Sequence, residues 1–247
     1  MKKIFVPLCV VGTLACASFT FAESAPYSTS RYQSVLDDSK LQAPGSNTLI
    51  KQGDFAGAYN DYFYVPDSGN KWMTFEMTGY LARSELRQMD EWYSSDSSYT
   101  NKMIGEVEVI NPEDGEVDEI TFMQIHDVSG NSNAINKPLV RLVWERERDG
   151  IENHYWAVIK EDACKDCKNY LKVDIGEHKD DPVKFEIRVT DSKLTIKRDG
   201  ATISGLNKYD IGYWDHLENY FKAGVYNQTS GTAKVQFKTL KYYTQAN

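Results

Sequence analysis

The sequence has 247 residues, with 28 basic and 36 acidic side chains and a formal net charge of −8 at pH 7. This length suits one domain with a sizeable core. Because the chain has no global basic field, its composition argues against nucleic acid as a partner, and an anionic ligand would need a local basic groove.

Residues 1–22 have the pattern of an export signal. Lys2-Lys3 form a basic start, residues 4–21 are largely apolar, and residues 20–22 form a small-x-small cleavage motif. An uncleaved membrane anchor is the alternative, and Pro7 argues against it. We expect cleavage after Ala22 and a secreted or periplasmic protein with no membrane contact. Its 26 basic residues (28 − 2) against 36 acidic ones give a net charge near −10.

Residues 23–49 are polar and lack a clear period, which predicts an extended lead-in with a short helix over Ser34–Leu41 as an option. From there to residue 247, short apolar or alternating runs recur between turn signals such as Pro66–Gly69 and Asn111–Gly115. The predicted strands are Trp72–Tyr80, Ser84–Met89, Met103–Ile110, Glu119–Val128, Leu139–Glu145, His154–Lys160, Tyr170–Asp174, Val183–Thr190, Lys193–Arg198, Tyr220–Gln228 and Ala233–Tyr243.

Many short strands without alternating helices indicate an all-β protein, a two-sheet sandwich or jelly roll, over residues 50–247. Cys9 and Cys16 belong to the export signal, which leaves Cys164 and Cys167. In an exported chain this pair is expected to form a small disulfide, since zinc needs more ligands and a thioredoxin-like role needs a βαβ context.

Three predicted strands carry unusual polar faces. Because successive side chains of a strand point to opposite faces, one face of residues 220–228 carries phenols, an ammonium and an amide around Gly224. Gln124 and His126 likewise share a face, opposite Met123 and Ile125. The third such face presents two arginines and a carboxylate, at Arg83, Glu85 and Arg87. Individually, each face is also explained by ordinary cross-strand pairing.

As neighbours in one sheet, the three faces would form one patch with cations, an amide, an imidazole and a phenol. No carboxylate pair suits glycoside hydrolysis, and no histidine pair has metal-ligand spacing. The set suits proton abstraction beside a carboxylate: cation and amide donors stabilise the developing charge, a histidine takes the proton and a tyrosine returns one. In a 4-linked uronate polymer this reaction is β-elimination.

Arg83-Ser84-Glu85-Leu86-Arg87, Gln124-Ile125-His126 and Tyr220-Phe221-Lys222-Ala223-Gly224-Val225-Tyr226-Asn227-Gln228 resemble the three signature motifs of the alginate lyases of polysaccharide lyase family 7. The resemblance covers most of the mature chain. It implies a concanavalin-like β-jelly roll with a concave substrate cleft, and endolytic elimination without metal or cofactor.

By motif position, the resemblance implies that Arg83 and Gln124 neutralise the uronate carboxylate, with His126 as general base and Tyr226 as general acid. For mannuronate, Tyr226 serves as both base and acid. Substrate contacts are expected at Arg87, Lys222 and Gln228, with Glu85 orienting the arginines and Tyr220 structural or in the cleft wall. The isoleucine of the middle motif tilts the preference towards guluronate, although Ile125 points away from the cleft.

Two other functions stay open at this point: a non-catalytic carbohydrate-binding module or lectin on the same fold, and a lyase for another polyuronate such as glucuronan. We expect alginate as the partner and a monomer as the working form. Glu91–Asn101 and Ser129–Lys137, both rich in Ser and Asn, are the candidate loops for closing over the cleft.

Overall fold

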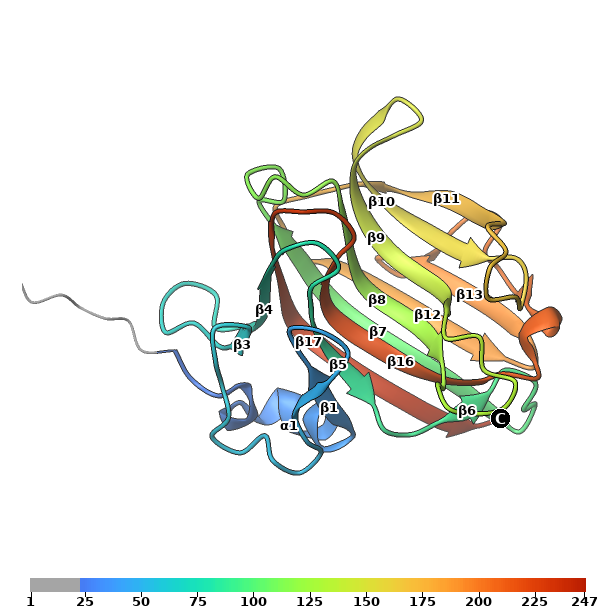
Figure 1. The fold of residues 1–247 in the computed structure, drawn as a ribbon, viewed down its shortest axis with the longest axis horizontal. Helices are drawn as coiled ribbons and strands as arrows, with labels where there is room; N and C mark the ends of the chain where they lie inside the picture. The colour runs from blue at the N-terminus through green and yellow to red at the C-terminus, as the bar shows by residue number, and fades with distance from the viewer. Residues whose placement is uncertain (1–22) are drawn as a thin grey trace, which may run out of the picture.

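Two antiparallel β-sheets packed face to face make up the body of the protein, in a computed structural model that describes residues 23–247 (Figure 1). The predicted export signal lies outside the described residues. Every strand predicted from residue 72 onward corresponds to an observed strand. The predicted all-β jelly roll is confirmed.

The first sheet, here called the front sheet, contains the three motif strands. In spatial order its strands are β11 (Tyr170–Glu177), β10 (Ile151–Lys160), β9 (Pro138–Arg148), β8 (Glu119–Asp127), β16 (Glu218–Asn227), β5 (Arg83–Gln88), β1 (Ser39–Gln42) and β2 (Thr48–Ile50), with β6 (Trp92–Tyr93) paired to β16.

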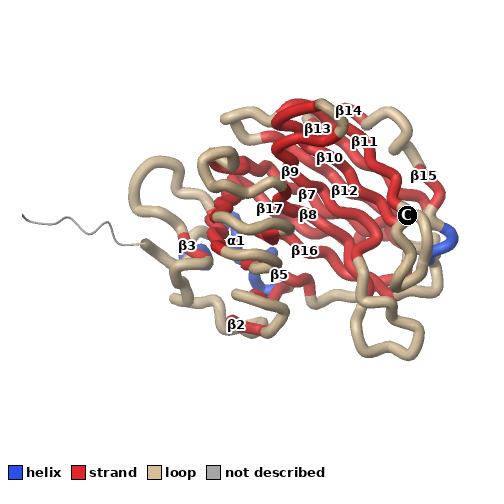
Figure 2. Tube along the Cα trace, turned by 45° about the horizontal axis from the view of Figure 1, so that its top comes forward, coloured by secondary structure: helices blue, strands red, loops and turns tan. Residues whose placement is uncertain are grey.

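The second sheet, the back sheet, closes the other side of the core. Its strands in spatial order are β14 (Ala201–Thr202), β13 (Lys193–Arg198), β12 (Val183–Thr190), β7 (Tyr99–Ile110), β17 (Thr232–Ala246), β4 (Met73–Thr78) and β3 (Phe63–Tyr64), with β15 (Tyr209–Asp210) paired to β13. The helical segments η1 (Pro26–Ser28), α1 (Ser30–Asp37) and η2 (Gly212–Trp214) are short and lie at the margins of the sheets (Figure 2). Within residues 23–247, none of the helices is long and apolar enough to span a membrane.

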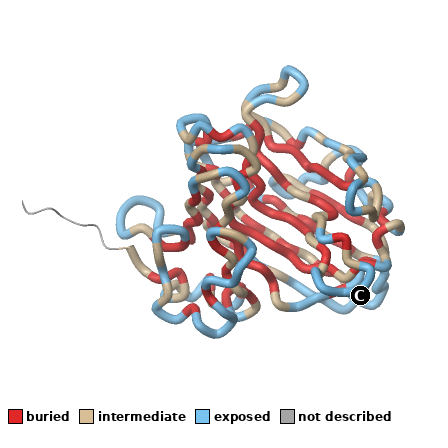
Figure 3. Tube along the Cα trace, viewed as in Figure 1, coloured by how far each residue is buried: buried red, intermediate tan, exposed pale blue. Residues whose placement is uncertain are grey.

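The core lies between the sheets because each motif strand turns its apolar face inward. Phe221, Ala223 and Val225 of β16 are fully buried, and the strand centres are buried in Figure 3. Aromatic rings join the two layers: Phe122 of β8 lies 5.3 Å from Phe185 of β12. This burial frees the opposite face of the front sheet for polar side chains.

The segment predicted as a lead-in differs from the expectation, because it is part of the fold. Its helix runs over Ser30–Asp37 rather than Ser34–Leu41, and it is followed by β1 and β2 at the edge of the front sheet. The hydroxyl of Tyr32 donates to the carbonyl of Phe237 at 2.7 Å and accepts from the N–H of Met73 at 3.0 Å. With little more than two helical turns, the segment shows no period strong enough to read from sequence.

The connection between β10 and β11 contains the disulfide Cys164–Cys167, as predicted. The ammonium of Lys160 donates to the carbonyl of Cys167, which attaches this loop to the end of β10.

Candidate active site

Strand β16 is the centre of the site, since it lies between β5 and β8 in the front sheet. The outward residues of β16 stand directly opposite motif residues of both neighbours. The opposed pairs are Tyr220 with His126, Lys222 with Gln124 and with Arg87, and Tyr226 with Arg83. The prediction that the three motif strands are neighbours in one sheet is confirmed.

A cleft of about 400 Å³ opens on the outer face of the front sheet. Its lining combines five predicted residues (Arg83, Gln124, His126, Tyr226, Gln228) with six others (Ser46, Asn136, Lys137, Pro138, Arg141, Tyr170). The four residues predicted to be catalytic therefore share one cavity. The remaining predicted residues, Glu85, Arg87, Tyr220 and Lys222, lie outside its lining.

The carboxylate of Glu85 anchors the polar groups beneath the cleft. This side chain is 1% exposed and accepts a hydrogen bond from Nε2 of Gln124 at 2.5 Å. It also pairs with Nζ of Lys222 at 2.5 Å and with a guanidinium nitrogen of Arg83 at 3.4 Å. Since a buried carboxylate without partners is costly, Glu85 holds all three donors in fixed positions.

Lys222 faces this anchor rather than the cleft. It is 1% exposed, and burial lowers the pKa of Lys222 to about 8, against the opposing effect of Glu85. The expectation that Lys222 contacts substrate directly does not match this geometry, because its ammonium is turned to Glu85. Its position is that of a residue supporting the cleft floor.

Gln124 is oriented by the same carboxylate. Because a carboxylate only accepts hydrogen bonds, the amide NH₂ of Gln124 faces Glu85. Its second N–H and its carbonyl oxygen remain for a group in the cleft. The amide is thus pre-organised before any ligand binds.

Arg83 and Tyr226 form one wall of the cleft. The guanidinium carbon of Arg83 lies 4.0 Å from the ring centroid of Tyr226, and its buried Nε has no hydrogen-bond partner among residues 23–247. Burial raises the pKa of Tyr226, against the opposing charge of Arg83. The phenol is therefore protonated at neutral pH and can donate.

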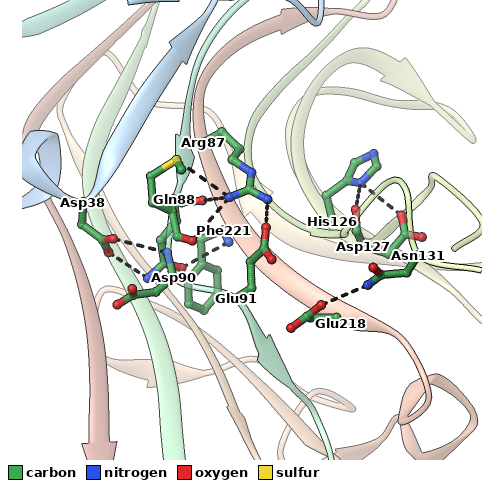
Figure 4. A network of polar contacts seen from close by, with 11 residues as sticks. Asp38, Arg87, Gln88, Asp90, Glu91, His126, Asp127, Asn131, Glu218 and Phe221 are labelled. Carbon is green, nitrogen blue, oxygen red and sulfur yellow. Dashed lines mark hydrogen bonds and ion pairs between the residues drawn. The ribbon is translucent and has the colours of Figure 1, made fainter. Parts of the chain in front are cut away.

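His126 is held by its successor in the chain, Asp127 (Figure 4). Its Nδ1 lies 2.8 Å from the backbone carbonyl of Asp127 and 3.2 Å from the Asp127 carboxylate. Because a carbonyl oxygen can only accept, Nδ1 carries the proton in the neutral ring. Nε2 is then the nitrogen with a free lone pair, as a general base requires.

Asp127 was not among the predicted residues, yet it also fixes the loop that the sequence singled out at 129–137. Its carboxylate accepts the backbone N–H groups of Ile135, Asn136 and Lys137 at 2.8, 2.9 and 2.8 Å. Burial alone would raise the pKa of Asp127, but the hydrogen bonds from His126 and the loop outweigh burial and lower it. Asp127 is ionised, and its carboxylate connects the His126 imidazole to the backbone of residues 135–137 at the edge of the cleft.

Tyr220 and Arg87 lie behind His126. The Tyr220 ring stacks on the His126 ring at 5.7 Å between centroids and 21° between planes, and the guanidinium carbon of Arg87 lies 4.0 Å from the Tyr220 centroid. Arg87 is bound in turn to Glu91 and to the carbonyl of Gln88 (Figure 4). Direct substrate contact by Arg87, as expected, does not match this geometry, because Arg87 and Tyr220 are both buried. They form a stack that orients the imidazole.

Of the cleft residues that sequence reasoning missed, two come from strands β9 and β11, on the far side of β8 from β16. Arg141 of β9 stands opposite Gln124 of β8 and pairs with Glu119 at 2.6 Å, and Tyr170 begins β11. The alternation around Arg141, between buried Val140 and Leu142, was the signal that could have placed it on the outer face.

The cleft thus combines an imidazole, a phenol, a guanidinium and a fixed amide. This set can move a proton beside a carboxylate and stabilise the resulting charge. Within residues 23–247, no three His, Cys, Asp or Glu side chains gather closely enough to hold a metal ion.

Comparison with known proteins gives one consistent family. A profile of the family described as "Alginate lyase" matches residues 35–244. An alginate lyase from Photobacterium sp. (strain ATCC 43367) is 30% identical over 275 residues, covering 95% of this chain and 95% of the relative.

Solved structures of alginate lyases have the same fold as this chain. Alginate lyase AlyC3 superimposes with a TM-score of 0.82 at 30% identity, covering 90% of this chain and 96% of that chain. Its complex with dimannuronate gives a TM-score of 0.82 at 28% identity, covering 93% and 100%. Alginate lyase A1-II′, a member of polysaccharide lyase family 7, shares the fold with a TM-score of 0.69 at 24% identity, covering 88% and 99%.

Proposed function

This chain belongs to the alginate lyase family, and from that premise we propose that it cleaves alginate within the polymer by β-elimination, leaving an unsaturated uronate at the new non-reducing end. The observation that carries the proposal is the single cleft lined by Arg83, Gln124, His126 and Tyr226.

In this proposal Arg83 and Gln124 bind the carboxylate of the uronate at the cleaved bond. Arg83 lines the cleft with its guanidinium group, and Gln124 offers the N–H that Glu85 leaves free. Removing a proton beside a carboxylate places additional negative charge on that group. Donors already in position stabilise this charge without reorganising during the reaction.

The proton transfers follow from the two remaining side chains. Nε2 of His126 takes the proton from the carbon next to the carboxylate, the C–O bond to the leaving sugar breaks, and a C=C bond forms. The Tyr226 hydroxyl gives its proton to the departing oxygen. For mannuronate, where the hydrogen lies on the opposite face of the ring, Tyr226 acts as both base and acid: it must first lose its own proton, and its phenolate then takes the proton from the carbon and gives it to the departing oxygen.

Block preference is the finer part of the proposal. The Gln124-Ile125-His126 motif favours guluronate-containing blocks, whereas the relative AlyC3 was solved with dimannuronate. Ile125 itself is fully buried in the core, so its influence on preference acts through the position of its two neighbours. Product analysis over time on separate guluronate and mannuronate blocks decides between the two, and the size of early products tests endolytic cleavage.

We also propose that the protein is exported after cleavage at Ala22 and acts as a monomer. The pattern of residues 1–22 supports export. Amino-terminal sequencing of the mature protein and its mass in solution are the corresponding measurements.

The catalytic assignment predicts that His126→Ala and Tyr226→Phe each lower turnover by about 100- to 10,000-fold, as loss of a general acid or base does. Polymer binding is retained, because Arg83 and Gln124 remain. The assay is the near-ultraviolet absorbance of unsaturated uronates formed from alginate. A parallel assay with glucuronan as substrate tests the alternative that the protein cleaves another polyuronate.

His154→Ala and Tyr99→Phe are matched controls, since His154 pairs with Asp174 on the surface and Tyr99 is exposed. Full activity of both catalytic variants would remove the assigned roles. Absence of unsaturated product from every alginate block type would remove the proposed function.

A further inference from the structure

A second cavity, of about 320 Å³, lies on the outer face of the back sheet, the sheet opposite the active-site cleft. Its lining is basic and rich in threonine, and comes from three strands and the loops beside them. The lining residues are Thr100, Arg188, Thr190, Asp191, Lys193, Thr195 and Lys208. None of them belongs to the three motifs or to the elimination site.

The pairing of the back sheet extends this cavity into a row across four strands. Thr195 of β13 stands opposite Arg188 of β12, Arg188 opposite Lys102 of β7, and Lys102 opposite Tyr243 of β17. Neighbouring strands lie about 4.8 Å apart. A hydroxyl, a guanidinium, an ammonium and an aromatic ring therefore follow one another at nearly regular spacing on one outer face.

Two cations stand directly opposite each other in this row, at Arg188 and Lys102. Like charges in that relation destabilise a sheet. In the part of the chain that the structure describes, neither pairs with a carboxylate: Asp191, the acid of the cavity lining, forms no ion pair with them, Asp210 pairs with Lys193 at 2.7 Å and Glu186 with Lys197 at 3.7 Å. Nζ of Lys102 lies instead 4.7 Å from the ring centroid of Tyr243.

The loop before β15 brings a further cation to the cavity. Lys208 is exposed and has a φ of 57°, a left-handed conformation that few lysines adopt. Its backbone N–H donates to the hydroxyl of Thr195 at 3.1 Å, which fixes the loop against the cavity floor. Thr100 and Thr190 share a hydrogen bond of 2.7 Å at the opposite side. The left-handed backbone of Lys208 and the like-charge pair thus lie at one cavity, whose threonine hydroxyls are already engaged in hydrogen bonds within the protein.

We infer that this row, Thr195–Arg188–Lys102–Tyr243 with Lys208, is a second, non-catalytic binding site for an anionic polysaccharide. Carboxylates of the polymer neutralise the unpaired cations, and a sugar face rests on Tyr243, which is 38% exposed. In a protein of net charge −8 such a basic patch is a local exception that attracts a polyanion.

The identification of the polymer as alginate rests on the proposed function. Because a long polymer reaches both faces, a second site raises the effective concentration of the chain at the cleft. It has no such effect on a short oligosaccharide, which occupies one site at a time. The inference therefore predicts a defect that depends on substrate length.

The test uses the full protein with Tyr226→Phe, which keeps the polymer intact, in native gels with and without alginate. Arg188→Gln with Lys208→Gln should weaken retardation by alginate roughly fivefold, the effect of losing two exposed ionic contacts. Lys51→Gln with Lys71→Gln is the control, because it removes the same charge from exposed positions elsewhere. In the active protein, the Arg188 and Lys208 changes should raise KM for polymer and leave cleavage of a uronate trisaccharide unchanged.

A structural role for Arg188 would lower the melting temperature on substitution, whereas relief of like-charge repulsion leaves it equal or higher without polymer. Tyr243→Ala provides a second variant that leaves the charges intact and should also weaken retardation. Retardation equal to that of the control overturns the inference. A protein that is retarded by alginate but yields no unsaturated uronate contradicts the proposed function and not the second site.

Discussion

At the scale of single residues, the least exposed group of the site carries much of its organisation. Glu85 lies outside the cleft lining but binds two residues that do line it, Arg83 and Gln124, and the buried Lys222. In catalytic terms it is a positioning residue, because its contacts are with the groups that we assign to the substrate carboxylate.

Glu85→Gln should therefore lower both stability and turnover. The change leaves the buried ammonium of Lys222 without its carboxylate, and breaking such a buried pair costs about 3–5 kcal/mol. Glu106→Gln is the control: it breaks the more exposed pair with Lys238, worth up to about 1 kcal/mol. Chemical denaturation and steady-state kinetics give both quantities. Equal effects of the two changes would contradict the anchoring role.

The lowered pKa of Lys222, about 8, predicts opposite pH trends for activity and stability. As pH rises through 8 the folded protein loses the ammonium that balances Glu85, so kcat/KM should fall. The unfolded chain keeps that proton up to an ordinary lysine pKa. It therefore binds more protons than the folded chain over this range, and the contribution of Lys222 to the free energy of unfolding increases with pH.

Tyr226 does not cause this fall of kcat/KM above pH 8, because burial raises the pKa of Tyr226. Profiles of kcat/KM and of melting temperature between about pH 7 and 10, compared with those of Lys222→Met, test the assignment. In the variant, kcat/KM should no longer fall near pH 8, and the melting temperature should depend less on pH. If kcat/KM still falls near pH 8, another group causes the fall.

At the scale of elements, the site depends on how closely β16 approaches β5. Gly224 stands opposite Glu85 with a φ of 149°, and a Cβ at this position would lie 2.2 Å from the carbonyl oxygen of Ser84 and 2.7 Å from Cα of Glu85. Only glycine allows the backbones to pass at this distance. The glycine in the third motif therefore sets the spacing between the strand of the proton donor and the strand of the anchor.

Gly224→Ala should force the two strands apart and lower both stability and turnover. The cost combines backbone strain of about 1–2 kcal/mol with overpacking of about 1–3 kcal/mol. Gly130→Ala separates the two contributions, because Gly130 also has a positive φ but nothing within 4 Å of an added Cβ. Thermal unfolding and turnover of both variants are compared. A Gly224 variant no worse than the Gly130 variant would show that the close approach is unimportant.

At the scale of the whole molecule, residues 23–49 are a structural part of the sandwich. Helix α1 contributes Tyr32, Val35 and Leu36 to the core between and beside the sheets, and β1 pairs with β5, the strand that carries Arg83 and Glu85. The edge of the active-site sheet is thus built from a segment that looks like a tail in the sequence.

Leu36→Ala should lower the free energy of unfolding by about 2–5 kcal/mol, as removal of a fully buried leucine does. For a chain of this size, that corresponds to roughly 2–4 °C in melting temperature for each kcal/mol. Leu49→Ala is the control, since Leu49 is 46% exposed. If both variants melt alike, the amino-terminal segment is not part of the cooperative unit.

Much of the fold was predictable because its signals are local. Alternation of apolar and polar residues marked the longer strands after residue 72, but not the two-residue strands β6, β14 and β15, and assigned the outward faces of Arg83, Gln124, His126 and Tyr226. The export signal, which leaves Cys164 and Cys167 as a pair, likewise predicted their disulfide.

The sequence by itself therefore determined most of the strands and the faces of their side chains, since period-two alternation is a property of the local backbone, while the catalytic roles followed from the resemblance to the family motifs. Tertiary structure alone decided which outward residues reach the cleft. Lys222, Arg87 and Tyr220 have the same parity as the catalytic residues, but ion pairs and stacking across strands bury them. Arg141 and Tyr170 enter the lining, and the row on the back sheet forms, only through pairing between distant segments. Burial and proximity depend on what lies across the sheet, which no local pattern encodes.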